Sequence, residues 1–233
     1  MPALALASLT GMLAGAGHVF SGPDHLAAVA PLAVDQKARC WRAGLFWGLG
    51  HSGGVWLLAI GAVVAQGVLP MHDLSRWSEG TVGVVLIGIG LWALRTRGRF
   101  RGGRPDHHRH GVAAHHARRH HAHGTHVHAR SHPHAHTRAR TTGLLGVGAL
   151  HGLAGGSHLL GVVPAIAMPT TGTSAAYLVS FGLGAVAAMS LFSWLVGRVH
   201  RCGDGAVQRM MVLCGGLAIV VGALWLRAAV VAI

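Results

Sequence analysis

Charged residues are scarce in this chain of 233 residues, and acidic residues are the scarcest. Asp, Glu, Lys and Arg together make up 11% of the sequence, and only six residues are acidic, whereas 52% of all residues are hydrophobic. Soluble domains carry about 25% charged residues. The composition therefore excludes an ordinary water-soluble fold and predicts that much of the apolar surface faces lipid.

Cysteine pairs and nucleotide-binding motifs are also missing. The three cysteines, Cys40, Cys202 and Cys214, form no Cys-x-x-Cys pair and no disulfide framework, and none lies beside the histidines of the apolar spans, which disfavours a thiolate site for copper(I) or zinc. No Gly-x-x-x-x-Gly-Lys-Ser/Thr sequence occurs, so the chain has no ATPase signature. The net charge of +13 comes from basic residues in the stretches between apolar spans, not from one basic face, which argues against a nucleic-acid partner.

Apolar stretches dominate what is present. A helix needs about 20 apolar residues to cross a bilayer, and six stretches approach or exceed this length. We therefore predict an all-α, polytopic membrane protein with six transmembrane helices. The N-terminal stretch has no basic residues before it, so we expect a first helix there and not a cleaved signal peptide. The predicted spans are 4–34, 43–68, 80–94, 143–168, 174–196 and 207–231.

Basic residues are distributed unevenly between the two predicted sides of the membrane. All of the 19 Lys and Arg residues except Arg76 and Arg227 fall on one side. Positively charged loops stay in the cytoplasm. We therefore expect a multi-pass cell-membrane protein with both termini outside and a long central loop in the cytoplasm.

The two halves of the sequence resemble each other. His18, Gly22, His25 and Pro31 recur 133 residues later as His151, Gly155, His158 and Pro164. Three spans per half is an odd number, so the prediction is a 3+3 inverted repeat of the kind found in secondary transporters. Helix breaks are expected in the first and fourth spans, because Gly relaxes and Pro interrupts a helix. The predicted breaks are Gly22, Pro23, Gly155 and Gly156, and the predicted units are 1–98, a His-rich disordered cytoplasmic loop at 99–140, and 141–233.

The central loop has an unusual composition. It contains no apolar periodicity but is rich in histidine, whose imidazole binds nickel, cobalt, zinc and copper. The loop is therefore predicted to capture or buffer metal ions, although a solvated basic linker is the alternative. Its histidines are His107, His108, His110, His115, His116, His120, His121, His123, His126, His128, His132, His134 and His136.

One carboxylate lies among histidines within the predicted spans. Asp24 is the only acid predicted at membrane depth, where ionisable groups are costly and usually functional. Imidazoles with one carboxylate suit a borderline divalent metal, whereas calcium or magnesium would require more oxygen ligands. The predicted metal ligands are His18, Asp24, His25, His51, His151 and His158.

These residues resemble the NicO superfamily of nickel/cobalt transporters, in particular its six-span, UreH-like (urease-accessory) branch. The resemblance rests on Gly22-Pro23-Asp24-His25 following His18, on Gly48-Leu-Gly-His51-Ser52, and on His151-Gly-Leu-Ala-Gly-Gly-Ser-His158. It implies that the protein is a permease and not an enzyme. The permease would move nickel or cobalt as its substrate and would have no prosthetic group. Its implied partners are the lipid bilayer and a metallochaperone or a urease or hydrogenase maturation system.

Two other functions are compatible with parts of the pattern. Gly50-His51-Ser52-Gly53 matches the nucleophile motif of rhomboid-type intramembrane proteases, for which His151 would be the base. A thiol-disulfide electron carrier shares the inverted plan, but it requires a cysteine pair where this sequence has histidines.

Overall fold

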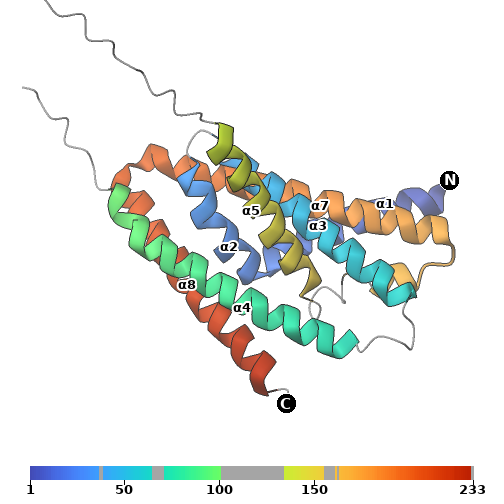
Figure 1. Cartoon of the computed structure of the whole chain (residues 1–233). Coiled ribbons are helices and arrows are strands. Elements are labelled where there is room, and N and C mark those ends of the chain that lie inside the picture. Colours follow the sequence, from blue (N-terminus) through green and yellow to red (C-terminus); the bar gives the residue numbers. More distant parts are fainter. Residues whose placement is uncertain (37–38, 65–70, 101–133, 155–160, 162, 232–233) are drawn as a thin grey trace, which may run out of the picture.

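The computed structural model describes residues 1–36, 39–64, 71–100, 134–154, 161 and 163–231, and these residues are helical apart from short turns and connections (Figure 1). This confirms the all-α class. The helices are α1 (Pro2–Ser21), α2 (Pro23–Asp35), α3 (Trp41–Val64), α4 (Met71–Thr96), α5 (His134–Leu153), α7 (Thr171–Gly197) and α8 (Asp204–Val231), with short 3₁₀ helices η2 (Arg97–Phe100) and η3 (Arg198–Cys202).

Five helical segments within the described residues are long and apolar enough to cross a membrane. α2 is too short, since its 13 residues extend only about 20 Å. α5 is not among the five, because its first turns carry His and Arg side chains. The five segments are Pro2–Ser21, Trp41–Gly61, Glu79–Thr96, Thr171–Cys202 and Asp204–Val231.

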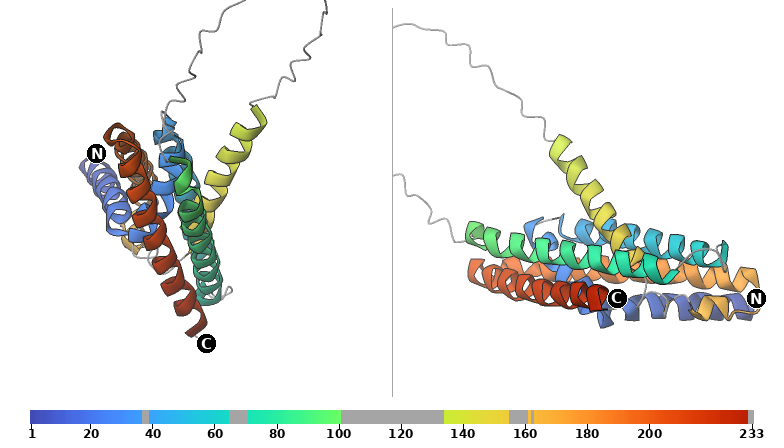
Figure 2. Two further views of the ribbon diagram at one scale, coloured as in Figure 1. Left: turned by 90° about the vertical axis from the view of Figure 1, so that its left-hand side faces the viewer. Right: turned by 60° about the horizontal axis from the view of Figure 1, so that its bottom comes forward.

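The first and fourth predicted spans differ most from the observed helices. The predicted 4–34 span is two helices, with α1 ending at Ser21 and α2 beginning at Pro23. α5 begins at His134, inside the segment predicted to be disordered, so that prediction is wrong for residues 134–140. Alanine and arginine in this stretch are strong helix formers, and they extend the helix beyond its apolar part. Its N-terminal end diverges from the other helices (Figure 2).

Helices from opposite halves of the chain pack together in pairs, α1 with α7, α3 with α5, and α4 with α8. Glycine brings the backbones close in each pair. A Cβ added at Gly83 would lie 2.7 Å from the carbonyl oxygen of Gly222, and one added at Gly222 would lie 2.6 Å from that of Gly83. Gly90 and Gly215 are paired in the same reciprocal way. Small residues at such contacts are typical of helix packing in membranes.

Two side chains connect α3 to α7. The Ser52 hydroxyl donates to the Gly182 carbonyl at 3.1 Å, and the Trp56 indole donates to the Leu178 carbonyl at 2.9 Å. The two donors are four residues apart on α3, and the two acceptors are four residues apart on α7, which is about one helical turn in each case. The two bonds therefore fix the register of α3 against α7 just beyond His51.

Candidate metal centre

The junction of α1 and α2 places a carboxylate at a helix start. Gly22 is extended, with φ −91° and ψ 104°, and serves both as the C-cap of α1 and as the N-cap of α2. Pro23 occupies the first helical position, where its missing N–H costs nothing. Asp24 follows in the first turn and is only 5% exposed. The positive end of the helix dipole stabilises an anion at this position.

Asp24 lies between two histidines from different halves of the chain. One carboxylate oxygen, Oδ1, is 3.0 Å from Nδ1 of His25, and the other, Oδ2, is 2.9 Å from Nε2 of His151. All three side chains are buried. The carboxylate thus joins α2 to α5 and determines how both rings are oriented.

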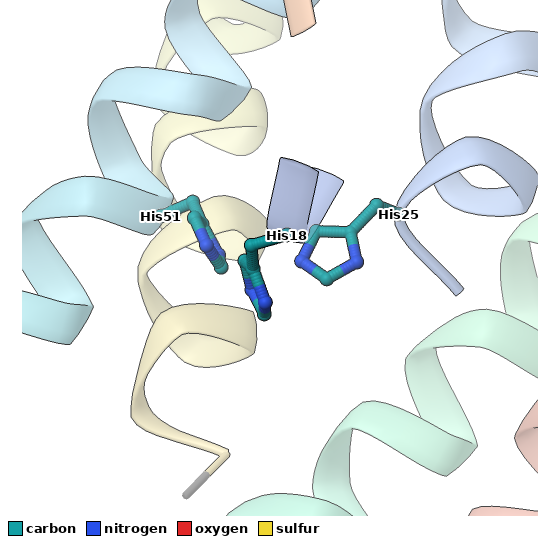
Figure 3. A group of neighbouring side chains, drawn as sticks. All are labelled: His18, His25 and His51. Carbon is teal, nitrogen blue, oxygen red and sulfur yellow. The ribbon is translucent and has the colours of Figure 1, made fainter. Parts of the chain in front are cut away.

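A group of three histidines lies next to this carboxylate. His18 comes from α1, His25 from α2 and His51 from α3, and one ring nitrogen of each lies within 4.8 Å of the others. Figure 3 shows the three rings close together, and their centroids lie 4.7, 5.0 and 5.7 Å apart. His25 and His51 are fully buried and His18 is half-buried. Asp24, His25 and His151 form a second group of the same compactness, so His25 belongs to both.

Aromatic rings support the histidines. Trp47, which is fully buried, stacks on His51 with a centroid distance of 5.4 Å and an interplanar angle of 9°. The same indole lies 5.0 Å from the His151 ring. Phe181 of α7 lies 5.7 Å from the His18 ring. These contacts restrict the rings to a few orientations and keep the surroundings apolar.

The structure brings five of the predicted ligands together, His18, Asp24, His25, His51 and His151. His158, Gly155 and Gly156 lie outside the described residues, as do the loop histidines from His107 to His132. α5 includes His134 and His136 as helical residues, but their side chains are not described.

Sequence reasoning missed two contributors to this region, Trp47 and Phe181. Trp47 precedes His51 by four residues, the spacing that places two side chains on one helix face, and this signal was available. Phe181 approaches from the other half of the chain, which no local pattern indicates. His200, which was assigned to a connection, does lie in η3 between α7 and α8, and its Nε2 is 2.8 Å from the carbonyl oxygen of Val34 at the other end of α2 from Asp24.

The arrangement is chemically suited to a divalent transition metal. Three imidazoles supply nitrogen donors of the kind preferred by nickel, cobalt, copper and zinc. A carboxylate that holds the far side of a ligating imidazole fixes its tautomer and increases its basicity. Asp24 is placed to do this for His25 and also supplies negative charge beside the group.

The residues that the two alternative functions require have other roles. Ser52 donates to the Gly182 carbonyl, and Nε2 of His151 lies beside Asp24. Cys40, Cys202 and Cys214 are all free, with Cys40 buried and Cys202 exposed. The geometry therefore supports neither an activated serine nor a redox pair.

Comparison with known proteins gives two distant relatives. Chloroplast protein FOR GROWTH AND FERTILITY 1 of Arabidopsis thaliana is 28% identical over 202 residues, which cover 86% of this chain and 52% of the relative. Chloroplast protein FOR GROWTH AND FERTILITY 2 of the same plant is 26% identical over 202 residues, covering 86% of this chain and 50% of the relative. The chain spans about half the length of these curated relatives. No protein-family model and no solved structure matches it.

Proposed function

We propose that this protein transports a divalent transition-metal ion, nickel or cobalt, across a membrane. The observation that carries the proposal is the group of His18, His25 and His51, buried among apolar helices and backed by Asp24. Ionisable side chains are costly to place inside a membrane, and those found there usually have a function. The NicO resemblance of the sequence motifs points to the same function.

His25 is the central ligand in this scheme. A neutral imidazole has one N–H and one lone-pair nitrogen. Because Nδ1 lies 3.0 Å from the carboxylate of Asp24, the proton belongs on Nδ1 and the lone pair on Nε2. A metal ion bound with His18 and His51 would then be coordinated through Nε2 of His25, with the charge of Asp24 on the opposite side of the ring.

An inverted 3+3 repeat is part of the proposal and is supported by matching contacts. Gly15 and Gly148 are 133 residues apart. Gly15 closely approaches the carbonyl oxygen of Phe181, and Gly148 closely approaches that of Trp47. These carbonyls belong to residues 134 apart. The rings of the same two aromatic residues approach His18 and His151. A pseudo-twofold axis through the metal centre would relate the two sets of contacts.

The predicted topology agrees with where the basic ends lie. Figure 1 places the C-terminal end of α4 and the junction between η3 and α8 at one end of the molecule, with the C-terminus toward the other. We propose that this basic end is cytoplasmic and that the histidine-rich segment beside it captures or buffers the transported ion. A metallochaperone or a urease or hydrogenase maturation system would be the partner there.

The test is metal flux in proteoliposomes that contain the purified protein. Asp24→Asn should nearly abolish nickel and cobalt flux, because an amide cannot provide the missing charge in a low-dielectric site. His51→Ala should reduce flux strongly by removing a coordinate bond. Asp204→Asn makes the same chemical change at an exposed carboxylate and should leave flux unchanged.

The affinity of each variant for metal should change in parallel with its flux. Isothermal titration with nickel should show weak binding to the Asp24 and His51 variants and normal binding to the Asp204 control. Normal flux in correctly inserted Asp24→Asn would overturn the assignment of the site. Absence of nickel and cobalt flux in the wild-type protein, loaded from either side, would overturn the transport function.

A further inference from the structure

A basic hollow opens between the ends of α4 and α8, far in sequence from the metal centre. Its volume is about 580 Å³. Arg95 and Arg97 come from the end of α4 and from η2, and Arg209 comes from the first turns of α8. Gln208 adds an amide, and Leu94 and Leu213 form an apolar wall.

No acidic side chain of the described residues pairs with the three guanidinium groups. Among the described residues, none of the three forms a hydrogen bond or an ion pair with another side chain. The nearest acid in sequence is Asp204, which is exposed and does not line the hollow. By contrast, Arg42 and Arg198, elsewhere on the predicted cytoplasmic side, lie over the rings of Phe46 and Trp194.

The hollow lies where apolar helices end. The membrane-crossing segment of α4 ends at Thr96, and that of α8 begins at Asp204. This is the depth of lipid headgroups if these helices span the bilayer. The arginines are exposed there, and Leu213, one turn further into the apolar part of α8, is 72% exposed.

We propose that this hollow binds the phosphodiester headgroup of an anionic membrane lipid. Guanidinium groups bind phosphate oxygens in pairs of parallel hydrogen bonds, and three of them face one hollow here. The exposed leucine provides a surface for the acyl chain, which a free phosphate ion would not use. Topology alone requires positive charge at this end but does not require that the charges converge on a hollow.

The inference depends on the membrane-spanning part of the proposed function but not on the metal site. Arg95→Gln, Arg97→Gln and Arg209→Gln are combined in one variant. The control combines Arg42→Gln, Arg198→Gln and Arg201→Gln, which removes the same charge from the same side. Both proteins are reconstituted in nanodiscs of phosphatidylglycerol and phosphatidylcholine, and lipids retained on release into detergent are counted by native mass spectrometry.

The wild-type protein and the control should retain phosphatidylglycerol in preference to phosphatidylcholine. A hydrogen bond to a charged group strengthens binding about tenfold or more, so the hollow variant, which loses those of three guanidinium groups to one phosphate, should bind phosphatidylglycerol at least about a hundredfold more weakly than the control. Equal loss in both variants would mean diffuse surface attraction and would overturn the proposal. So would equal retention of both lipids by the wild-type protein, or displacement of the lipid by millimolar inorganic phosphate.

Nickel affinity is measured in the same samples. It should be unchanged in the hollow variant, because none of the three arginines belongs to the metal centre. Loss of lipid preference with intact nickel binding supports a separate lipid site. If the hollow variant lost nickel binding as well as its preference for the anionic lipid, the two sites would not be separate.

Discussion

Replacing Gly22 with alanine should weaken metal binding without unfolding the protein. A Cβ at this position would collide with Nδ1 of His25 and would lie 2.7 Å from Oδ1 of Asp24 and 2.8 Å from Cε1 of His25. The ring would have to rotate away, which breaks its contact with the carboxylate. Loss of such an orienting contact typically lowers metal affinity about 10- to 100-fold, equivalent to about 1.4–2.7 kcal/mol.

The backbone at Gly22 does not itself require glycine. Its φ of −91° is accessible to alanine, and Gly→Ala at such a position stabilises a protein by about 0.4–1 kcal/mol through the unfolded state. The melting temperature should therefore not fall substantially while the nickel Kd rises. Gly17→Ala is the matched control, because a Cβ there meets nothing within 4 Å.

Isothermal titration with nickel in detergent, with thermal melts on the same samples, provides the measurement. A double mutant gives the sharpest result. If Gly22→Ala acts only by displacing the His25 ring, it should have no further effect on affinity in a His25→Ala background. A wild-type Kd for Gly22→Ala, or full additivity in the double mutant, would refute the proposed role of His25.

Four further outcomes are expected. Trp47→Phe should retain cobalt affinity, whereas Trp47→Leu should weaken it about fivefold, because stacking on the histidine ring contributes about 1 kcal/mol beyond burial. Cobalt titration of both variants provides the measurement, and equal affinities would contradict this role of Trp47. His200→Ala should lower the free energy of unfolding by about 1 kcal/mol, through loss of its contact with Val34, while nickel affinity stays normal; a changed nickel Kd would place it in the site. Deleting residues 102–133 should preserve insertion and basal flux but alter the dependence of flux on metal concentration, and abolished flux would assign the segment to the pathway. A cysteine at Asp73 should react with impermeant reagents from outside the cell, and labelling from the cytoplasm alone would invert the topology.

The residues of the candidate metal centre could largely be singled out from the sequence, because a membrane excludes polar groups. Asp24 was identified because it is the only acid within an apolar span, and His18 and His151 because they repeat. The first argument depends on the cost of burying polar groups, which is independent of tertiary detail. That same cost explains why Asp24 and His151 meet, since each satisfies the other.

Contacts between the two halves of the chain were harder to predict. Nothing local indicates that Phe181 approaches His18, because a phenylalanine in an apolar helix is equally suited to lipid. The start of α5 was misplaced because its first turns are polar, and polarity was taken as a sign of disorder. Helix propensity, which depends on the backbone and not on burial, overrides composition there.

The glycine contacts determine which substitutions can compensate for one another. A Cβ at Gly15 would strike the carbonyl oxygen of Phe181, and one at Gly148 that of Trp47. Both obstacles are main-chain atoms, which no change of side chain can remove. A genetic selection that starts from Gly15→Ala should therefore yield no suppressor at Phe181 itself. As the two halves of the sequence diverge, such glycines should persist whatever side chains lie opposite them.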